Sequence, residues 1–128
     1  MKDSEQRVDI LLVDDSDSTC ESVRTLLEDA GYRVQTLNGP FGFIKAVREH
    51  VPKLVLIDVG LGTMNGTKLV PLGRQHAPRH TKILLFSGRD TEELMHDVRV
   101  SGADGFVSKN ESPEQLAIEV GRWMNRAR

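Results

Sequence analysis

The chain has 128 residues, 38% of them hydrophobic, so it can bury one substantial core, and we expect a single domain over residues 1–128 with its core at about 8–124. A net charge of −2 gives no basic footprint for nucleic acid, and no apolar run approaches the length of a membrane span. A single cysteine excludes an internal disulfide, and the polar N-terminus lacks the apolar stretch of a signal peptide, so we expect a cytoplasmic protein.

Short apolar runs alternate with amphipathic stretches along the chain. Five runs predict β-strands, at residues 8–13, 33–37, 54–57, 82–86 and 105–107. Three of them are nearly continuous Val, Ile and Leu, which is typical of parallel strands covered on both faces. The run 33–37 alternates instead and therefore predicts an edge strand.

Apolar residues spaced three or four apart predict helices between these runs. The predicted faces contain Val23, Leu26, Leu27 and Ala30, then Phe43 and Val47, then Leu94 and Val98, and finally Leu116, Val120 and Trp123. Either Ser16 or Ser18 can cap the first helix, and Ser112 followed by Pro113 begins the last. The segment 66–77 carries Pro71, which predicts a short, late-starting or kinked helix.

The alternation of strands and helices predicts the fold class. We expect a doubly wound α/β fold, a flavodoxin-like (βα)5 arrangement with helices on both faces of a five-stranded parallel sheet. The expected strand order is 2-1-3-4-5, with its switch point between the first and third strands. Ligands in such sheets bind beyond the carboxyl ends of the strands at that point.

Polar residues follow four of the predicted strands. Strand one ends at Asp14 and Asp15, strand three at Asp58, strand four at Ser87 and strand five at Lys109. Each residue alone is an ordinary turn or cap, but all of them meet at one edge of the sheet. Two carboxylates about 4 Å apart repel by roughly 4 kcal/mol at an effective dielectric of 20, so the cluster predicts a cation, Mg²⁺ or Mn²⁺.

At these positions the sequence resembles the receiver domain of two-component response regulators. The resemblance extends from residue 8 to about 123. It is carried by LLVDDS (11–16), LVLID (54–58), Met64-Asn65-Gly66, FSG (86–88) and GADGFVSK (102–109), and by the order and spacing of these motifs.

The resemblance implies a role for each of these residues. Asp58 would be the phosphoacceptor, and Ser87 and Lys109 would contact the phosphoryl oxygens. Asp14, Asp15, Asp58 and the backbone carbonyl of Gly60 would hold the metal ion. Phe106 would be the aromatic switch residue that responds to Ser87. The space beside Asp58, bordered by Gly60 and Arg89, is a candidate for tuning the dephosphorylation rate.

The same resemblance implies a phosphorylation-dependent signalling switch rather than a metabolic enzyme. A histidine kinase or phosphotransfer protein would supply the phosphoryl group, and the domain would catalyse its own phosphotransfer and dephosphorylation. Phosphorylation would reshape the face formed by the fourth helix, fifth strand and fifth helix, and so regulate a downstream partner or an attached output domain. A homodimer is possible, and direct binding to nucleic acid or a membrane is not expected.

Two other readings remain open from the residues. A pseudo-receiver would keep the fold as a binding module without the chemistry; it is suggested by Gly62, Asn65 and Asn110, which replace the family's usual proline, aspartate and proline. A haloacid-dehalogenase-like phosphatase would use Asp15 as nucleophile and Asp17 as general acid, with Thr19 completing its motif. In that reading Asp58 has no role.

Overall fold

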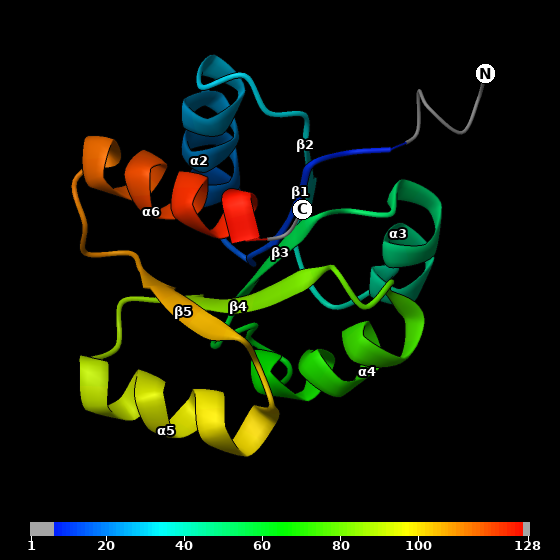
Figure 1. The fold of residues 1–128 in the computed structure, drawn as a ribbon. Helices are drawn as coiled ribbons and strands as arrows, with labels where there is room; N and C mark the ends of the chain where they lie inside the picture. Colours follow the sequence, from blue (N-terminus) through cyan, green and yellow to red (C-terminus); the bar gives the residue numbers. More distant parts are fainter. Residues whose placement is uncertain (1–6, 127–128) are drawn as a thin grey trace.

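The computed structural model describes residues 7–126, which form a parallel sheet of five strands (Figure 1). The strands are β1 (Ile10–Val13), β2 (Val34–Leu37), β3 (Leu54–Asp58), β4 (Lys82–Ser87) and β5 (Gly105–Ser108). They lie in the order β2-β1-β3-β4-β5, and every neighbouring pair is parallel. The predicted order is confirmed, and the switch point lies between β1 and β3.

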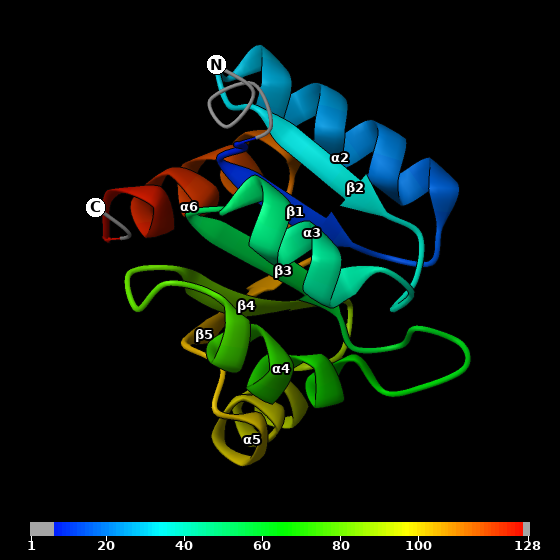
Figure 2. The same cartoon turned by 90° about the vertical axis from the view of Figure 1, so that its right-hand side faces the viewer.

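Helices connect the strands and cover both sides of the sheet (Figures 1 and 2). They are α2 (Asp17–Asp29), α3 (Phe43–His50), the 3₁₀ turn η1 (Gly66–Lys68), α4 (Leu69–His76), α5 (Thr91–Ser101) and α6 (Pro113–Arg126). Within residues 7–126, none of these helices combines the length and the apolar character needed to cross a membrane.

The two faces of the sheet have separate hydrophobic cores. Helices α2 and α6 cover one face, and α3, α4 and α5 cover the other. The first core contains Ile10, Leu12, Leu54, Leu56, Leu84, Phe86, Leu27 and Val120; the second contains Leu11, Val13, Val55, Ile57, Ile83, Leu85, Phe43, Val47 and Leu94. Because β1, β3 and β4 are buried on both faces, they require the continuous apolar runs seen in the sequence.

Strand β2 lies at an edge of the sheet, as its alternating sequence predicted. All four of its residues are only partly buried, whereas the four residues of β1 are 0% exposed. A strand with one covered side needs fewer apolar residues, which explains the weaker pattern.

The segment 66–77 forms a late-starting helix. Residues Gly66–Lys68 make the 3₁₀ turn, capped by the Asn65 side chain, which accepts from Thr67 N–H at 2.9 Å. Helix α4 then begins at Leu69, so Pro71 is its third residue. At that position the backbone N–H would have no intrahelical partner, and the missing donor of proline costs nothing.

Side-chain caps fix the starts of the other helices. Ser16, and not Ser18, caps α2 by accepting from Thr19 N–H at 3.2 Å. Asp90 caps α5 by accepting from Glu93 N–H at 2.9 Å. Ser112 accepts from the Gln115 N–H at the start of α6 at 3.1 Å. These starts place the first turns of α2, α5 and α6 directly after the strand ends that carry the polar residues.

Candidate functional site

The register of the sheet brings the polar strand ends together. Val13 of β1 pairs with Ile57 of β3, so the next residue of each strand, Asp14 and Asp58, lie side by side. Asp58 in turn pairs with Phe86 of β4. The next residue, Ser87, pairs with the last residue of β5, directly before Lys109. The predicted meeting of these groups at one edge is therefore confirmed.

The three carboxylates form one cluster with graded exposure. Each of Asp14, Asp15 and Asp58 offers an oxygen, and these three atoms lie within 4.8 Å of one another. Asp14 is 0% exposed and Asp58 is 7% exposed, whereas Asp15 is exposed to solvent. Asp14 and Asp58 therefore form the buried floor of the pocket, and the pocket is open to solvent on the side of Asp15.

The ammonium group of Lys109 lies between the two buried carboxylates. Its Nζ is 2.6 Å from Asp14 Oδ2 and 3.4 Å from Asp58 Oδ2. It also sits 5.2 Å from the centre of the Phe86 ring, which forms the apolar wall of the site. Lys109 therefore neutralises part of the buried negative charge while keeping a position beside Asp58.

Asp58 is held by its own chain on the other side. Its Oδ1 accepts a hydrogen bond from Gly60 N–H at 3.2 Å. Burial raises the pKa of the Asp58 carboxyl group above its usual value, and the nearby Lys109 ammonium opposes that rise. The environment thus keeps the carboxylate poorly solvated, a condition that is common at functional sites.

The loop after β3 is folded tightly onto Asp58. Gly60 and Asn65 form an antiparallel bridge, and Gly66 N–H donates to the Val59 carbonyl at 2.7 Å. A Cβ atom on Gly66 would lie 1.9 Å from the Asp58 carbonyl oxygen, so only glycine fits at that position. The close approach fixes the backbone of the candidate phosphoacceptor.

The donor set of the cluster fits a hard divalent cation. Asp14 Oδ2 is buried and accepts no well-directed hydrogen bond within residues 7–126; its counter-charge is the Lys109 ammonium. Carboxylate oxygens with one solvent-open side are the environment that Mg²⁺ uses when it keeps some of its waters. The carboxylates present therefore fit the ion.

Ser87 is buried, at 5% exposure, and its hydroxyl accepts from Arg89 N–H at 3.1 Å. The Lys109 N–H donates to the Ser87 carbonyl at 2.9 Å, so the two candidate phosphoryl-binding residues are joined through the backbone. Peptide bonds within residues 7–126 are all trans, including the bond between Lys109 and Asn110. Lys109 therefore reaches the pocket without the cis bond that a following proline usually provides in the resembling family.

The switch residue and the two rate-tuning candidates that the sequence predicted lie outside the carboxylate cluster. Phe106 is partly buried in β5 and packs on the core that α3, α4 and α5 cover. Gly60 is exposed, and a Cβ built on it meets nothing within 4 Å. The Arg89 side chain turns away along α5, where its Nη1 lies 2.8 Å from Asp97 Oδ2.

The groups needed by the phosphatase alternative are not brought together. Asp17 is the first residue of α2, is exposed and lies outside the carboxylate cluster. Thr19 lies in the same helical turn, where its N–H completes the Ser16 cap. The pocket instead uses Asp58, which has no role in that alternative.

Two further residues, given no role at the site from the sequence, contact residues that lie beside it. Asn110 donates from Nδ2 to the Gly88 carbonyl at 3.2 Å, which links the loops after β4 and β5. Asp97 is 8% exposed although it is charged, and its carboxylate pairs with the Arg89 guanidinium. The position of Asp97 three residues after the apolar Leu94 was the only sequence signal of its burial.

A known protein family has the sequence pattern that produces this site. Residues 10–120 match the model of the response regulator receiver domain. The chain belongs to this family. The matched range contains every residue of the pocket, from Asp14 to Lys109.

The receiver domain has curated relatives that are about three-tenths identical. It is 31% identical to the transcriptional regulatory protein ComA of Bacillus subtilis over 121 residues, covering 91% of this chain and 56% of that protein. It is 31% identical over 109 residues to the virulence-factor transcription regulator BvgA of Bordetella pertussis, covering 84% and 51%. It is also 31% identical over 122 residues to the sensor protein GacS of Pseudomonas syringae, covering 92% and 14%. The chain thus spans about half, or less, of these relatives.

Solved structures share the fold of the receiver domain. The chemotaxis protein CheY4 of Vibrio cholerae superposes with a TM-score of 0.81 at 28% identity, covering 91% of this chain and 98% of that one. The receiver domain of NtrX from Brucella abortus gives a TM-score of 0.80 at 25% identity, again covering 91% and 98%. The similarity therefore extends over nearly the whole of both chains.

Proposed function

We propose that this receiver domain is a signalling switch that accepts a phosphoryl group on Asp58. The observation that carries the proposal is the buried Asp58 carboxylate with the Lys109 ammonium 3.4 Å away. A histidine kinase or phosphotransfer protein is the expected donor, and a small acyl phosphate can replace it if the pocket itself supplies most of the catalysis.

In the transfer, a carboxylate oxygen of Asp58 forms a bond to phosphorus as the bond from phosphorus to the donor breaks. The departing donor atom takes the bonding electrons and a proton from solvent. Lys109 stabilises the negative charge on the phosphoryl oxygens, and the Ser87 hydroxyl donates to one of them. The acyl phosphate is later hydrolysed by water, which regenerates the carboxylate.

Mg²⁺ or Mn²⁺ is the proposed cofactor, with Asp14, Asp15, Asp58 and the Gly60 carbonyl as its protein ligands. When bound, the ion supplies positive charge that stabilises the transferring phosphoryl group. Asp14 and Asp58 orient the pocket from their buried positions, whereas Asp15 completes the ligand set on the solvent-open side.

The proposed output is a change of the α5-β5-α6 face. Movement of Ser87 toward the phosphoryl group leaves room for Phe106 to turn inward, and this shifts the population of that face. The proposed recipient is a downstream protein or an attached output domain in the cytoplasm, and a homodimer through this face is one form that the output could take. Gly60 and Arg89 are proposed to tune the dephosphorylation rate because they border the space beside Asp58.

The test is incubation of the chain with Mg²⁺ and acetyl phosphate, followed by intact-mass measurement. The expected result is an added mass of one phosphoryl group that disappears in Asp58→Ala. Absence of an Asp58-dependent adduct would favour a pseudo-receiver, and phosphatase turnover that depends on Asp15 would favour the phosphatase alternative.

A further inference from the structure

Arg89 and Asp97 form an ion pair on the surface of α5. The Arg89 Nη1 donates to Asp97 Oδ2 at 2.8 Å, and the Arg89 Nε lies 3.8 Å from Glu93 Oε2. The Asp97 side chain is only 12% exposed, whereas that of Arg89 is 42% exposed. A carboxylate this buried needs a partner, and Arg89 supplies it from outside the helix.

The backbone of Arg89 belongs to the phosphoryl site. Its N–H donates to the Ser87 hydroxyl at 3.1 Å, so the Cα of Arg89 stands directly beside that hydroxyl. A Cβ built on Gly60, two residues after Asp58, meets nothing within 4 Å, so the chain beside Asp58 is open there. The arginine is therefore anchored beside the site, with open space next to Asp58, while its guanidinium is held away on α5.

We propose that Arg89 exchanges partners, leaving Asp97 and binding the phosphoryl oxygens when Asp58 is modified. Asp97 is then a positioning residue that withholds the guanidinium in the unmodified state. The inference rests on the proposed phosphorylation of Asp58 and adds a second link from the phosphoryl group to α5. No covalent step is involved.

The energetics permit this exchange. A phosphoryl group adds about −1.5 to −2 charges and three strong acceptor oxygens, and arginine binds such groups with two parallel N–H donors. On the Arg89 side the existing pair is solvent-accessible, with 42% of that side chain exposed, so the guanidinium gives up little when it leaves the pair. For the Arg89 guanidinium, the interaction free energy gained with the doubly charged phosphoryl group therefore exceeds the interaction free energy lost with Asp97.

Asp97 does not become an isolated buried charge after the exchange. Arg89, Glu92, Glu93, His96 and Asp97 line an open depression of about 430 Å³ on α5. When the guanidinium leaves, water can enter this depression and solvate the Asp97 carboxylate. The α5 surface then carries acidic groups that no arginine neutralises. The exchange therefore changes the charge of the proposed output face.

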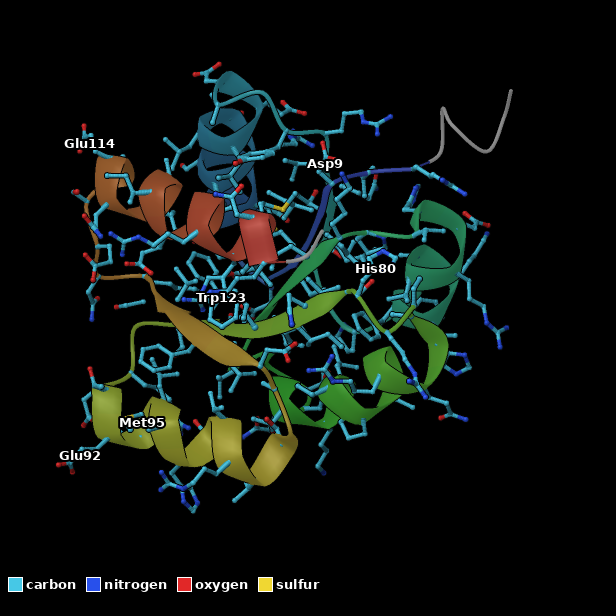
Figure 3. All side chains as sticks on the ribbon, viewed as in Figure 1. Asp9, His80, Glu92, Met95, Glu114 and Trp123 are labelled. Atoms are coloured by element: carbon cyan, nitrogen blue, oxygen red, sulfur yellow. The ribbon has the colours of Figure 1, made fainter. Side chains whose placement is uncertain are left out.

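The test is a titration of the chain with beryllofluoride in the presence of Mg²⁺. In Asp97→Asn the competitor for Arg89 is weakened, so the apparent Kd for beryllofluoride should fall by about fivefold. In the Arg89→Ala background the same Asp97→Asn change should alter the Kd by less than about twofold. Glu92→Gln is the matched control, because it removes the same charge from α5. Glu92 extends into solvent (Figure 3), and the ion pairs of Arg89 within residues 7–126 are with Glu93 and Asp97.

A second measurement uses the unmutated chain. The Nε–Hε NMR signal of Arg89, assigned with Arg89→Lys, should shift when beryllofluoride is added. In Asp97→Asn without beryllofluoride it should move away from its wild-type position, because the pair with Asp97 is lost. This measurement does not depend on how stable the Asp97 variant is.

Two results would overturn the exchange. The first is an Asp97→Asn effect of equal size in the presence and absence of Arg89, which would mean that only the charge of α5 matters. The second is an Arg89 signal that does not respond to beryllofluoride in a chain whose Asp58 does. If neither Asp58 nor Arg89 responds, it is the proposed phosphorylation of Asp58 that fails.

Discussion

The side-chain amide of Asn110 donates a hydrogen bond to the carbonyl oxygen of Gly88 at 3.2 Å. This contact joins the loop that follows Ser87 to the loop that begins at Lys109. Receiver domains usually have a proline at the position of Asn110, and its rigidity would hold the loop that begins at Lys109. In this chain a side-chain contact performs the same task.

Asn110→Ala should therefore slow phosphorylation by acetyl phosphate several-fold while changing stability by less than about 0.5 kcal/mol, because Asn110 is exposed and acts by positioning. The rate of phosphoprotein formation by intact mass checks the first part, and chemical unfolding checks the second. Glu111→Ala, also exposed and in the same loop, is the control. Equal rates in the two variants would show that the contact with Gly88 does not position the site.

Gly66→Ala should destabilise the fold by at least about 2 kcal/mol and abolish phosphorylation. The added Cβ would lie 1.9 Å from the Asp58 carbonyl oxygen, a backbone atom that cannot move without displacing Asp58. Urea unfolding measures the stability, and intact mass measures the modification.

Gly73→Ala is the matched comparison, since its Cβ would meet the flexible end of the Ile83 side chain at 2.8 Å. The alanine also favours helix α4. We expect Gly73→Ala to retain phosphorylation, and loss of it would mean that the site tolerates no shift of the core beneath it.

Mg²⁺ should raise the thermal stability of the wild-type chain. At ten times the dissociation constant, binding to the folded state alone adds about 1.4 kcal/mol to the free energy of unfolding. Asp15→Asn should remove most of this gain, because Asp15 is an exposed member of the carboxylate cluster and its replacement leaves the core intact. Calorimetry with and without MgCl₂ provides the measurement.

Asp17→Asn serves as its control, because Asp17 is an exposed acid two residues away that lies outside the cluster. An equal loss of Mg²⁺ stabilisation in both variants would contradict the assigned ligands.

Asp90→Ala should lower the midpoint of thermal unfolding at pH 7, because Asp90 caps α5. The hydrogen bond from the Glu93 backbone N–H lowers the pKa of the Asp90 carboxyl group below its usual value. A lowered pKa in the folded state contributes stability above the unfolded value, and that contribution is lost as the pH falls through the folded value. The difference between wild type and Asp90→Ala should therefore shrink as the pH falls below about 4.

Asp90→Asn separates the charge from the cap, since an amide oxygen accepts the same hydrogen bond without titrating. A difference between wild type and Asp90→Ala that stays constant down to pH 2 would assign the effect to the cap geometry alone.

The strand ends could be predicted from the sequence because each lies beside a continuous apolar run. Parallel strands deliver their last residues to one edge, so Asp14, Asp58, Ser87 and Lys109 had to meet there. Pro71 likewise indicated the late start of α4, because it fits only the first turn.

Other features depend on contacts between distant residues and left no periodic signal. The choice of Ser16 over Ser18 as the cap of α2 was set by where the chain leaves β1. Asp104 lies outside every apolar run of the sequence, yet its side chain accepts from Ile83 N–H at 2.8 Å and pairs with Arg74. The bond between Asn110 and Gly88 spans 22 residues and could be found only in the structure.

The register of β1 against β3 decides which face of the sheet each side chain of β1 occupies. Ile10 to Val13 alternate between the two cores, and Asp14 continues that alternation into the pocket at 0% exposure, whereas Asp15 falls on the solvent side. Inserting one residue in the middle of β1 would turn the side chains that follow it to the opposite faces, and would exchange the positions of the two aspartates at the same time. One alternation of side chains therefore places both the core residues of β1 and its two aspartates. An insertion in β1 would disturb the hydrophobic core and the carboxylate pocket together.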